Sequence, residues 1–338
     1  ESKDFYRDPA ISTPSITWDP STHYSYEQAR TVARQELSDD ISSDLDTDQI
    51  DYKLAIDYQL LDHAMIYAQM ASGFKAGEFG ARANSPLTAL PTDDEEAISY
   101  EAGLKSDWWD GRLRVNVALF WANYENMQFG VFMPSENVTG QETINLNVGE
   151  ATTQGVELDI SVQLHERLVL TVNAGYLDAE YDEFCADLDG ATTYTRAPVS
   201  RCGAVTDLGN GSYLVEEDHS SLELSRAPRY NYFISAEYDQ PLPEGMGEMT
   251  FLLSYAYSDE YFSDATLNHP AAKTGDFGYW DGNITWFSAS GTLRASLWGK
   301  NLSDKEEVSG VTPTANFFNQ RFWFPPRTWG VTLSYSFE

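Results

Sequence analysis

The amino-acid sequence predicts an all-β protein, an antiparallel β-barrel that crosses a membrane, with about eleven strands in this chain. Three observations predict it. Apolar and polar residues alternate along many segments, the polar side of these segments carries charges, and short and long connections alternate between them. Together they describe two-faced strands that are joined as a meander.

The alternation is strictest in three segments, 112–121, 155–162 and 329–337. In the first, Leu113, Val115 and Val117 alternate with Arg114 and Asn116. A side-chain period of two is typical of a β-strand with two chemically different faces. Soluble antiparallel sheets alternate as well, so this pattern predicts strands without choosing a membrane.

Charges and aromatic residues distinguish a membrane barrel from a soluble sheet. The polar face carries charges well inside the strands, as at Lys53 with Asp57 and at Glu157 with Asp159. The apolar face ends in Tyr, Trp or Phe, as at Trp121. A membrane barrel has lipid outside, a polar lumen inside and aromatic girdles at both interfaces, which is the layout expected here.

The lengths of the connections predict how the strands are arranged. We place strands at about 50–59, 63–73, 99–107, 112–127, 154–163, 167–180, 229–238, 249–260, 277–287, 291–301 and 327–337. Short connections at 60–62, 107–111, 164–166, 239–248 and 288–291 alternate with long ones at 74–98, 128–153, 181–228, 261–276 and 302–326. In an antiparallel meander this puts every long loop on one rim, as in outer-membrane barrels with long extracellular loops and short periplasmic turns.

The strand count predicts the domain organisation. About eleven antiparallel strands cannot close a barrel, because the first and last would run parallel. We therefore expect residues 50–338 to form the C-terminal half of a larger barrel, with the first half outside this chain. Residues 1–49 are expected to be an extracellular loop segment. In it, Ser25-Tyr26-Glu27-Gln28 is a capping box before apolar residues at helical spacing, which predicts a short surface helix.

Composition excludes several classes of protein. A formal net charge of −32 argues against a nucleic-acid partner, because binding a phosphate backbone requires a basic face. An aromatic content of 14% argues against disorder. No run approaches the roughly 18 to 20 apolar residues of a membrane-spanning helix.

The two cysteines, Cys185 and Cys202, fall in the longest connection, which lies on the predicted extracellular rim. Cysteines in an oxidising compartment commonly pair, and the segment between them has little apolar content with which to order itself. We expect a Cys185–Cys202 disulfide with a structural role; two unrelated thiols are the alternative. A Cys-x-x-Cys spacing, which would suggest redox chemistry, is absent.

The sequence predicts no catalytic site. None of the five histidines has a paired metal-binding spacing. Asp218, His219 and Ser220 supply the residue types of a hydrolytic triad, but adjacent residues cannot easily face one another as orienter, base and nucleophile. An enzyme is therefore not expected.

Acidic clusters raise the question of cation binding. One group is Glu36, Asp39, Asp40, Asp44, Asp46, Asp48 and Asp51, and a second is Asp93, Asp94, Glu95 and Glu96. The first resembles a calcium loop but has Gln49 at the required glycine and Ala55 at the closing glutamate. We interpret both as solvated acidic loops, without a resident cofactor or metal. Binding of Ca²⁺ is the alternative.

Ligand contacts are expected on the loop rim, facing the lumen. Aromatic rings stack on flat or sugar-like ligands, and arginine pairs with anionic groups. The residues that qualify by position are Phe74, Phe79, Arg82, Phe132, Tyr261, Phe262, Phe317, Phe318, Arg321 and Trp323. Packing within the loops or the girdles is the alternative for each of them.

Several segments resemble the TonB-dependent receptors, the active transporters of the Gram-negative outer membrane. The stretches that carry the resemblance are Asp51-Tyr52-Lys53-Leu54 with Ser72-Gly73-Phe74-Lys75-Ala76-Gly77, Ser99-Tyr100-Glu101-Ala102-Gly103-Leu104-Lys105, Gln154-Gly155-Val156-Glu157-Leu158, Gly299-Lys300-Asn301-Leu302 and Pro325-Pro326-Arg327-Thr328. They run in family order from about residue 50 to the end. The chain departs from the family in lacking a plug domain and a coupling motif, and in ending on Glu338 after the aromatic residue.

The resemblance implies a barrel of about 22 strands, plugged by an N-terminal domain. It implies contact with outer-membrane lipid, energised import of a scarce nutrient, and coupling to TonB through the missing N-terminal region. A ferric siderophore is the first expected ligand, and an oligosaccharide or cobalamin-like ligand the next. A passive outer-membrane porin and a secreted β-sandwich lectin or adhesin are the alternatives.

Overall fold

The computed structural model describes residues 4–6, 23–25, 45, 47–79, 91–134, 141–147, 149–187, 192–193, 200, 202, 205–207, 212–263, 272–314 and 318–337. Across these ranges the regular structure is β-strand, and no helix is long and apolar enough to cross a membrane. The helix expected after Ser25 falls at 26–44, outside the described residues.

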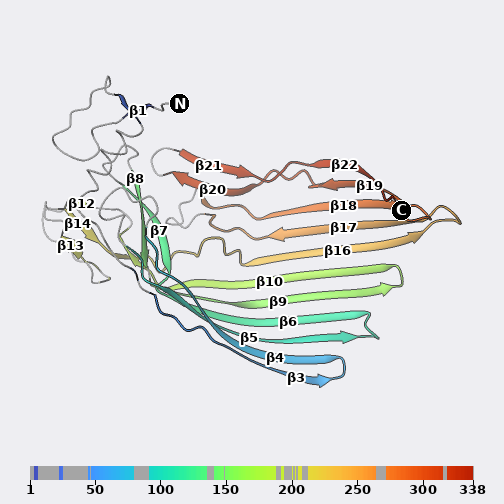
Figure 1. Cartoon of the computed structure of the whole chain (residues 1–338), viewed down its shortest axis with the longest axis horizontal. Coiled ribbons are helices and arrows are strands. Elements are labelled where there is room, and N and C mark those ends of the chain that lie inside the picture. Colours follow the sequence, from blue (N-terminus) through green and yellow to red (C-terminus); the bar gives the residue numbers. More distant parts are fainter. Residues whose placement is uncertain are drawn as a thin grey trace.

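One antiparallel sheet of 11 strands dominates the structure, in the order β22-β19-β18-β17-β16-β10-β9-β6-β5-β4-β3 (Figure 1). Its strands are β3 (Lys53–Leu61), β4 (Ala64–Lys75), β5 (Glu95–Trp108), β6 (Leu113–Glu125), β9 (Glu150–His165), β10 (Leu168–Glu183), β16 (Tyr230–Pro241), β17 (Glu248–Ser258), β18 (Phe277–Phe287), β19 (Leu293–Lys300) and β22 (Thr328–Tyr335). Each corresponds to one predicted strand, so the predicted meander is confirmed. A sandwich of two face-packed sheets is not what these strands form.

The two ends of the sheet differ as predicted. Tight turns join β3 to β4, β5 to β6, β9 to β10, β16 to β17 and β18 to β19 at one end, and the long connections all lie at the other (Figure 1). In Figure 1 the C-terminal end of the chain lies beside the tight turns. We call the end with the long connections the loop rim.

The register separates an apolar from a polar face. Leu104, Val117, Leu158 and Ala174 are directly paired across β5, β6, β9 and β10. The next row, one residue along, is Lys105, Asn116, Asp159 and Asn173. Because neighbours along a strand point to opposite sides, one face of the sheet is apolar and the other polar.

Aromatic side chains gather where the apolar face ends. Near the loop rim, Tyr176 packs against Tyr230 with ring centroids 5.4 Å apart, and Tyr255 against Trp280 at 4.9 Å. At the tight-turn end the indole of Trp286 donates to the carbonyl of Met246 at 2.8 Å. These rings fit the two predicted interfacial girdles.

Both edges of the sheet are open. Among the described strands, β3 pairs only with β4 and β22 only with β19. Leu333 on the last strand lies on the outward apolar face and is 73% exposed, compared with 50% for Leu297 on its neighbour β19. Such an edge presents a row of unpaired backbone N–H and C=O groups to which a further strand can pair.

The loop rim carries strands that the sequence did not predict. β7 (Gln128–Pro134) pairs with β8 (Gln141–Asn147), and β20 (Val308–Thr314) pairs with β21 (Phe318–Trp323). Smaller pieces are β11 (Cys185–Ala186) with β15 (Glu217–Asp218), and β12 (Thr192–Thr193), β13 (Val205–Asp207) and β14 (Ser212–Val215) in one sheet. β1 (Asp4–Tyr6) pairs with β2 (His23–Ser25).

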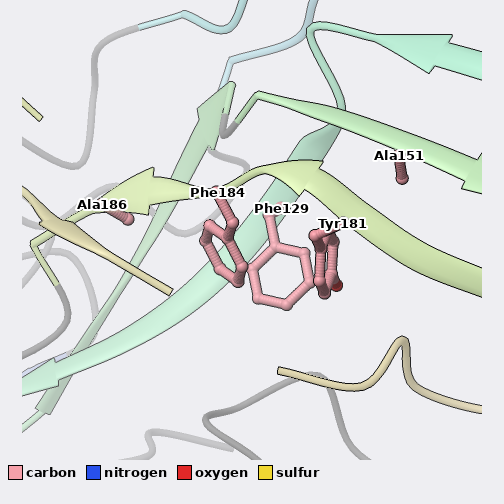
Figure 2. Close-up of a cluster of buried hydrophobic side chains, with 5 residues drawn as sticks. All are labelled: Phe129, Ala151, Tyr181, Phe184 and Ala186. Carbon is pink, nitrogen blue, oxygen red and sulfur yellow. The ribbon is translucent and has the colours of Figure 1, made fainter. Parts of the chain in front are cut away.

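A small hydrophobic cluster anchors the longest loop to the barrel end. Figure 2 shows the rings of Phe129, Tyr181 and Phe184 packed side by side. The Phe184 ring lies 5.3 Å from that of Phe129 and 4.8 Å from that of Tyr181. Phe184 is 1% exposed, so the loop leaves β10 from a fixed point beside β7.

Candidate functional site

A cleft of about 570 Å³ lies at the loop rim, where three long connections meet. Its lining includes Arg226, Tyr261, Ser263, Phe277, Ser309 and Phe322. Arg226 comes from the end of the loop after β10, Tyr261 and Ser263 from the loop after β17, and Ser309 and Phe322 from hairpin β20–β21. We call this the rim cleft.

Hydrogen bonds between the three connections hold the rim cleft in shape. The backbone N–H of Arg226 donates to the carbonyl of Phe262 at 2.7 Å. The hydroxyl of Tyr261 donates to the carbonyl of Ser309 at 3.1 Å. The backbone N–H of Val311 donates to Ser263 Oγ at 2.7 Å. The cleft therefore has walls fixed to one another rather than three independent loops.

The rim cleft opens toward the polar face of the sheet. Phe277 pairs directly with Ser258, and Ser254 with Asp281, on the rows of β17 and β18 that carry polar groups. Phe277 and Asp281 are four residues apart on one strand, so they lie on the same face. A molecule in the cleft would sit above the polar side of the barrel wall.

Arg226 is held in an unusual backbone conformation. Its φ angle is +57°, in the left-handed region that few non-glycine residues occupy. Its Nε donates to the carbonyl of Ser263 at 3.2 Å, while the side chain is otherwise exposed. A residue kept in such a conformation by its neighbours is a candidate for function. The guanidinium has further donors to offer an anionic group.

Aromatic rings form the other wall of the rim cleft. Phe277 packs on Phe324 with ring centroids 4.3 Å apart, and Phe322 is 48% exposed. A fixed ring beside an exposed one gives a flat ligand surfaces on which to stack. Arginine and aromatic rings together suit a ligand that has both a planar part and a negative charge.

A paired lysine lies beside Phe262, the residue between Tyr261 and Ser263 of the rim cleft. Lys273 Nζ lies 2.7 Å from Glu260 Oε1 and 5.4 Å from the centroid of the Phe262 ring. The hydrogen bond to Glu260 raises the pKa of Lys273, with smaller contributions from Glu223 and Asp259. Lys273 therefore keeps its charge at neutral pH, but that charge is already matched by a carboxylate.

The polar face also carries a second concave region, away from the rim cleft. It measures about 410 Å³ and is lined by Tyr67, Lys105, Asn116, Glu157 and Asp159 among others. The hydroxyl of Tyr67 lies 2.6 Å from Glu101, and the amide of Asn116 lies 3.2 Å from Asp159. These side chains give the polar face an extensive set of hydrogen-bonding groups.

Comparison with known proteins identifies the family. The profile described as "TonB dependent receptor-like, beta-barrel" matches residues 13–302. The chain belongs to the TonB-dependent receptor-like β-barrel family. Its match in sequence and the layout of its strands lead to the same assignment.

Solved structures share the fold of this receptor barrel. The ferric yersiniabactin uptake receptor FyuA from Yersinia pestis superposes with a TM-score of 0.62 at 18% identity, covering 85% of this chain and 37% of that chain. The siderophore receptor PiuA from Acinetobacter baumannii gives 0.58 at 17% identity, covering 84% and 35%. At these identities the likeness shows a common fold.

Two curated relatives match shorter stretches. The metal-pseudopaline receptor CntO of Pseudomonas aeruginosa is 31% identical over 128 residues, which are 38% of this chain and 16% of that protein. The pesticin receptor of Yersinia enterocolitica is 26% identical over 134 residues, 40% and 19% respectively. The aligned part of this receptor barrel thus spans less than a fifth of either relative.

The predicted ligand contacts are dispersed over the receptor barrel. Tyr261 lines the rim cleft, whereas its neighbour Phe262 is 7% exposed and packs under Lys273. Arg321 and Trp323 are exposed, but they flank Phe322 in sequence and so lie on the opposite side of hairpin β20–β21.

The remaining candidates lie elsewhere. Register places Phe74 on the same side of β4 as Ile66 and Met70, the apolar side, so it does not face the lumen. Phe79 is exposed and bridges to Pro91. Phe132 is in β7 and Phe318 in β21, while Arg82 and Phe317 fall outside the described residues. Their role in ligand contact stays a prediction.

Sequence reasoning found only Tyr261 among the lining residues of the rim cleft and missed the others, including Arg226, Phe277, Ser309 and Phe322. Phe277 begins a predicted strand and was assigned to the barrel wall for that reason. Arg226 stands two residues before Pro228 at the end of the longest connection. The position of Arg226, a cation at the loop-rim end of a predicted strand, was the signal that could have identified it as a ligand-contact candidate.

The predicted disulfide is confirmed. Cys185 and Cys202 are bonded, with their Cα atoms 5.8 Å apart. Cys185 also pairs with Asp218 in the short ladder of β11 and β15, directly beyond the buried Phe184. The cross-link therefore attaches the middle of the loop to its anchored end.

The acidic segment at 93–96 is engaged in hydrogen bonds. Asp94 accepts from the backbone N–H of Gly77 at 2.8 Å and from Thr47 at 3.0 Å, and Glu96 accepts from Gln49 at 2.9 Å. In the described part of the chain, no three His, Cys, Asp or Glu side chains are grouped to hold a metal ion. Calcium binding stays a prediction, which calorimetric titration tests.

Proposed function

We propose that this chain is the C-terminal half of the barrel of an energised importer in the Gram-negative outer membrane. The remaining wall, a plug and the segment that engages TonB would come from the rest of the protein. The proposed function is to bind a ligand and transport it, without catalysis. The observation that carries the proposal is the rim cleft, a rigid cleft on the loop rim of a TonB-dependent receptor barrel.

A ferric siderophore is the ligand that suits the rim cleft best. Siderophores combine negatively charged iron-binding groups with flat or apolar parts, which match the guanidinium of Arg226 and the rings of Tyr261, Phe277 and Phe322. Relatives and neighbours named for ferric yersiniabactin and metal-pseudopaline support this class. An oligosaccharide or a cobalamin-like ligand is the second candidate, since aromatic rings also stack on sugars.

A passive porin is the competing function. A porin would need neither a rigid ligand cleft nor an energy source, and the family of this chain favours the receptor. Cell fractionation and surface labelling of the loops test the outer-membrane location. Expression that is repressed by iron would separate a siderophore ligand from a sugar.

Binding to the purified full-length protein tests the ligand class directly. The probes are ferric complexes of catecholate, hydroxamate and carboxylate siderophores, together with cobalamin and maltohexaose. We expect one ferric complex to bind in a saturable way. Saturable binding of cobalamin or the sugar alone would move the assignment to the second candidate, and binding of none of the probes would contradict the proposed class.

A further inference from the structure

An interruption in the sheet separates the barrel wall from hairpin β20–β21. The ladder between β19 and β22 ends at Lys300 with Thr328, and the ladder between β20 and β21 begins at Val308 with Trp323. Residues 301–307 on one side and 324–327 on the other lie between the two ladders. Because these stretches differ in length, one regular ladder cannot run through them. We call this interruption the junction, and in Figure 1 the hairpin extends from it toward the loop rim.

The junction decides where one wall of the rim cleft lies. The hairpin beyond it supplies Ser309, Val311 and Phe322 to the cleft. Arg226 and Phe277, on the other side of the cleft, come from other parts of the chain. A tilt of the hairpin about the junction would therefore separate the two sides of the cleft.

The outgoing side of the junction is fixed to the barrel wall. The backbone N–H of Asn301 donates to Asp281 Oδ1 of β18 at 2.8 Å, and that of Leu302 donates to the carbonyl of Trp280 at 2.7 Å. The side chain of Leu302 covers Gly299, since a Cβ built on that glycine would lie 2.6 Å from Leu302 Cδ2. The chain thus leaves β19 along a set path.

The side chain of Asn301 carries this fixed position across to the returning strand. Its Nδ2 donates to the carbonyl of Lys305 at 2.8 Å and to that of Pro325 at 3.1 Å. Its Oδ1 accepts from the backbone N–H of Lys305 at 3.0 Å. Asn301 is 7% exposed, so water does not easily replace these bonds. One amide therefore connects both sides of the junction.

Asparagine suits this position for two reasons. The φ angle of Asn301 is +49°, in the left-handed region that asparagine enters more readily than most residues. Its amide also donates and accepts at once, whereas an aspartate carboxylate only accepts. Both the backbone and the hydrogen bonds of the junction thus depend on the residue type.

The junction also gives a physical role to two of the segments that resemble the family. Gly299–Leu302 and Pro325–Thr328 are far apart in sequence, and the Asn301 amide joins them. A second link runs from Arg327 Nη2 to Asp304 Oδ2 at 3.1 Å, but both side chains are about half exposed, so it contributes less. The buried amide is the stronger connection.

We propose that Asn301 is a positioning residue for ligand binding, which holds hairpin β20–β21 at the angle that closes the rim cleft. It acts through Ser309 and Phe322 and lies outside the cleft lining itself. The inference rests on the proposed function for its effect on binding. The position of the hairpin can be measured without any ligand.

The test measures the angle of the hairpin and the affinity separately, in the full-length protein. Nitroxide labels are attached through unnatural ketone-bearing residues at Arg321 on β21 and Ala289 in the turn between β18 and β19, which leaves the cysteines untouched. Double electron–electron resonance then gives the distance distribution between the labels. Binding and dissociation are followed with the ferric catecholate, hydroxamate and carboxylate complexes.

Asn301→Gly keeps the left-handed backbone accessible and removes the amide. We expect a broader distance distribution and binding weakened about tenfold, the value of one ordinary hydrogen bond, mainly through faster dissociation. Asn301→Asp, which keeps the size but not the donors, should act in the same direction. Asn126→Gly is the matched control: Asn126 is also left-handed, with φ +53°, and leads into another rim hairpin, but it is exposed and accepts from Asn147 at its backbone carbonyl.

Folding of each variant is checked by its heat-dependent shift on a denaturing gel. A folded Asn301→Gly variant with the wild-type distance distribution, or with a broader one and unchanged affinity, would overturn the proposal. An equal effect in Asn126→Gly would do so too. If neither Asn301 variant folds, Asn301 serves the folding of the barrel and the proposal falls. A wild-type protein that binds none of the ferric complexes would instead contradict the proposed function, while the distances still report on the junction.

Discussion

Ser263 Oγ accepts a hydrogen bond from the backbone N–H of Val311 at 2.7 Å, although the two residues are 48 positions apart. The same hydroxyl lies 2.8 Å from the carbonyl of Val311 and 2.9 Å from that of Ala272. Ser263 is 8% exposed and Val311 3%. One buried hydroxyl thus joins the loop after β17 to hairpin β20–β21 at the rim cleft.

Removal of this hydroxyl should loosen the rim cleft. In Ser263→Ala the buried N–H of Val311 loses its acceptor, which typically costs about 1–3 kcal/mol. We expect faster hydrogen exchange at Val311 and weaker ligand binding, with the barrel strands unaffected. Ser258→Ala is the matched control, because that residue also lines the cleft but, in the described part of the chain, its hydroxyl donates to the carbonyl of the adjacent Asp259. Equal hydrogen exchange at Val311 in both variants would contradict the role of the Ser263 hydroxyl in linking the loop after β17 to hairpin β20–β21.

Arg226 should decide the affinity for an anionic ligand. Arg226→Gln removes the charge while keeping a polar side chain, and the loss of a charge-assisted hydrogen bond typically costs about 1.5–3 kcal/mol. Arg226→Lys should lose less. Arg229→Gln is the control, since Arg229 lies 3.8 Å from Asp178 and does not line the cleft. Titration of a ferric complex measures all three, and a larger loss in Arg229→Gln would be contrary to our assignment.

Opening the disulfide should affect one loop only. In a chain-entropy estimate, a cross-link that closes a loop of about 15 residues is worth about 3 kcal/mol. With both Cys185 and Cys202 replaced by serine, limited proteolysis should cut between these positions more rapidly. The heat-dependent gel shift of the barrel should stay as in wild type. An unchanged cleavage rate would mean that the cluster around Phe184 alone orders the loop.

Acid should release the contact between Gly77 and Asp94. The Gly77 N–H, then Thr47 and Gln49, lower the pKa of Asp94 below its ordinary value of 3.8. A carboxyl whose pKa is lowered in the folded state contributes stability above its unfolded pKa and loses it as the pH falls through the folded pKa. We therefore expect the protection of the Gly77 amide, its exchange rate relative to the intrinsic rate at each pH, to fall below about pH 3.8 in wild type.

Two variants separate this effect from general acid unfolding. Asp94→Asn should remove the pH dependence of the protection at Gly77. Asp93→Asn should keep it, because Asp93 joins the network through its backbone N–H and carbonyl. If Asp93→Asn removed the pH dependence as well, the acid response would not belong to Asp94.

The barrel strands were predictable because their signal is local. Rows such as Lys105 with Asn116 follow from the period-two pattern of each strand alone, and the tight turns follow from the length between strands. The small rim strands were missed because their pattern is weak: β20 contains Gly310 and Pro313, which are poor strand residues. Their pairing depends on the partner strand rather than on their own sequence.

The rim cleft was only partly predictable for the same reason. Tyr261 was found from its type and position, but Arg226 owes its place to the hydrogen bonds that it donates to the carbonyls of Phe262 and Ser263, which are far away in sequence. Phe262 and Tyr261 are adjacent, yet one is buried and the other lines the cleft. Exposure of a loop side chain is set by tertiary packing, which no local pattern records.

Energy-dependent uptake tests the central claim most directly. Cells that express the full-length receptor are given a ferric siderophore labelled with radioactive iron, with and without the TonB coupling protein. The account predicts accumulation of iron that falls to background when TonB is absent or the proton gradient of the inner membrane is collapsed. Equal uptake under all three conditions would contradict it and indicate a passive pore.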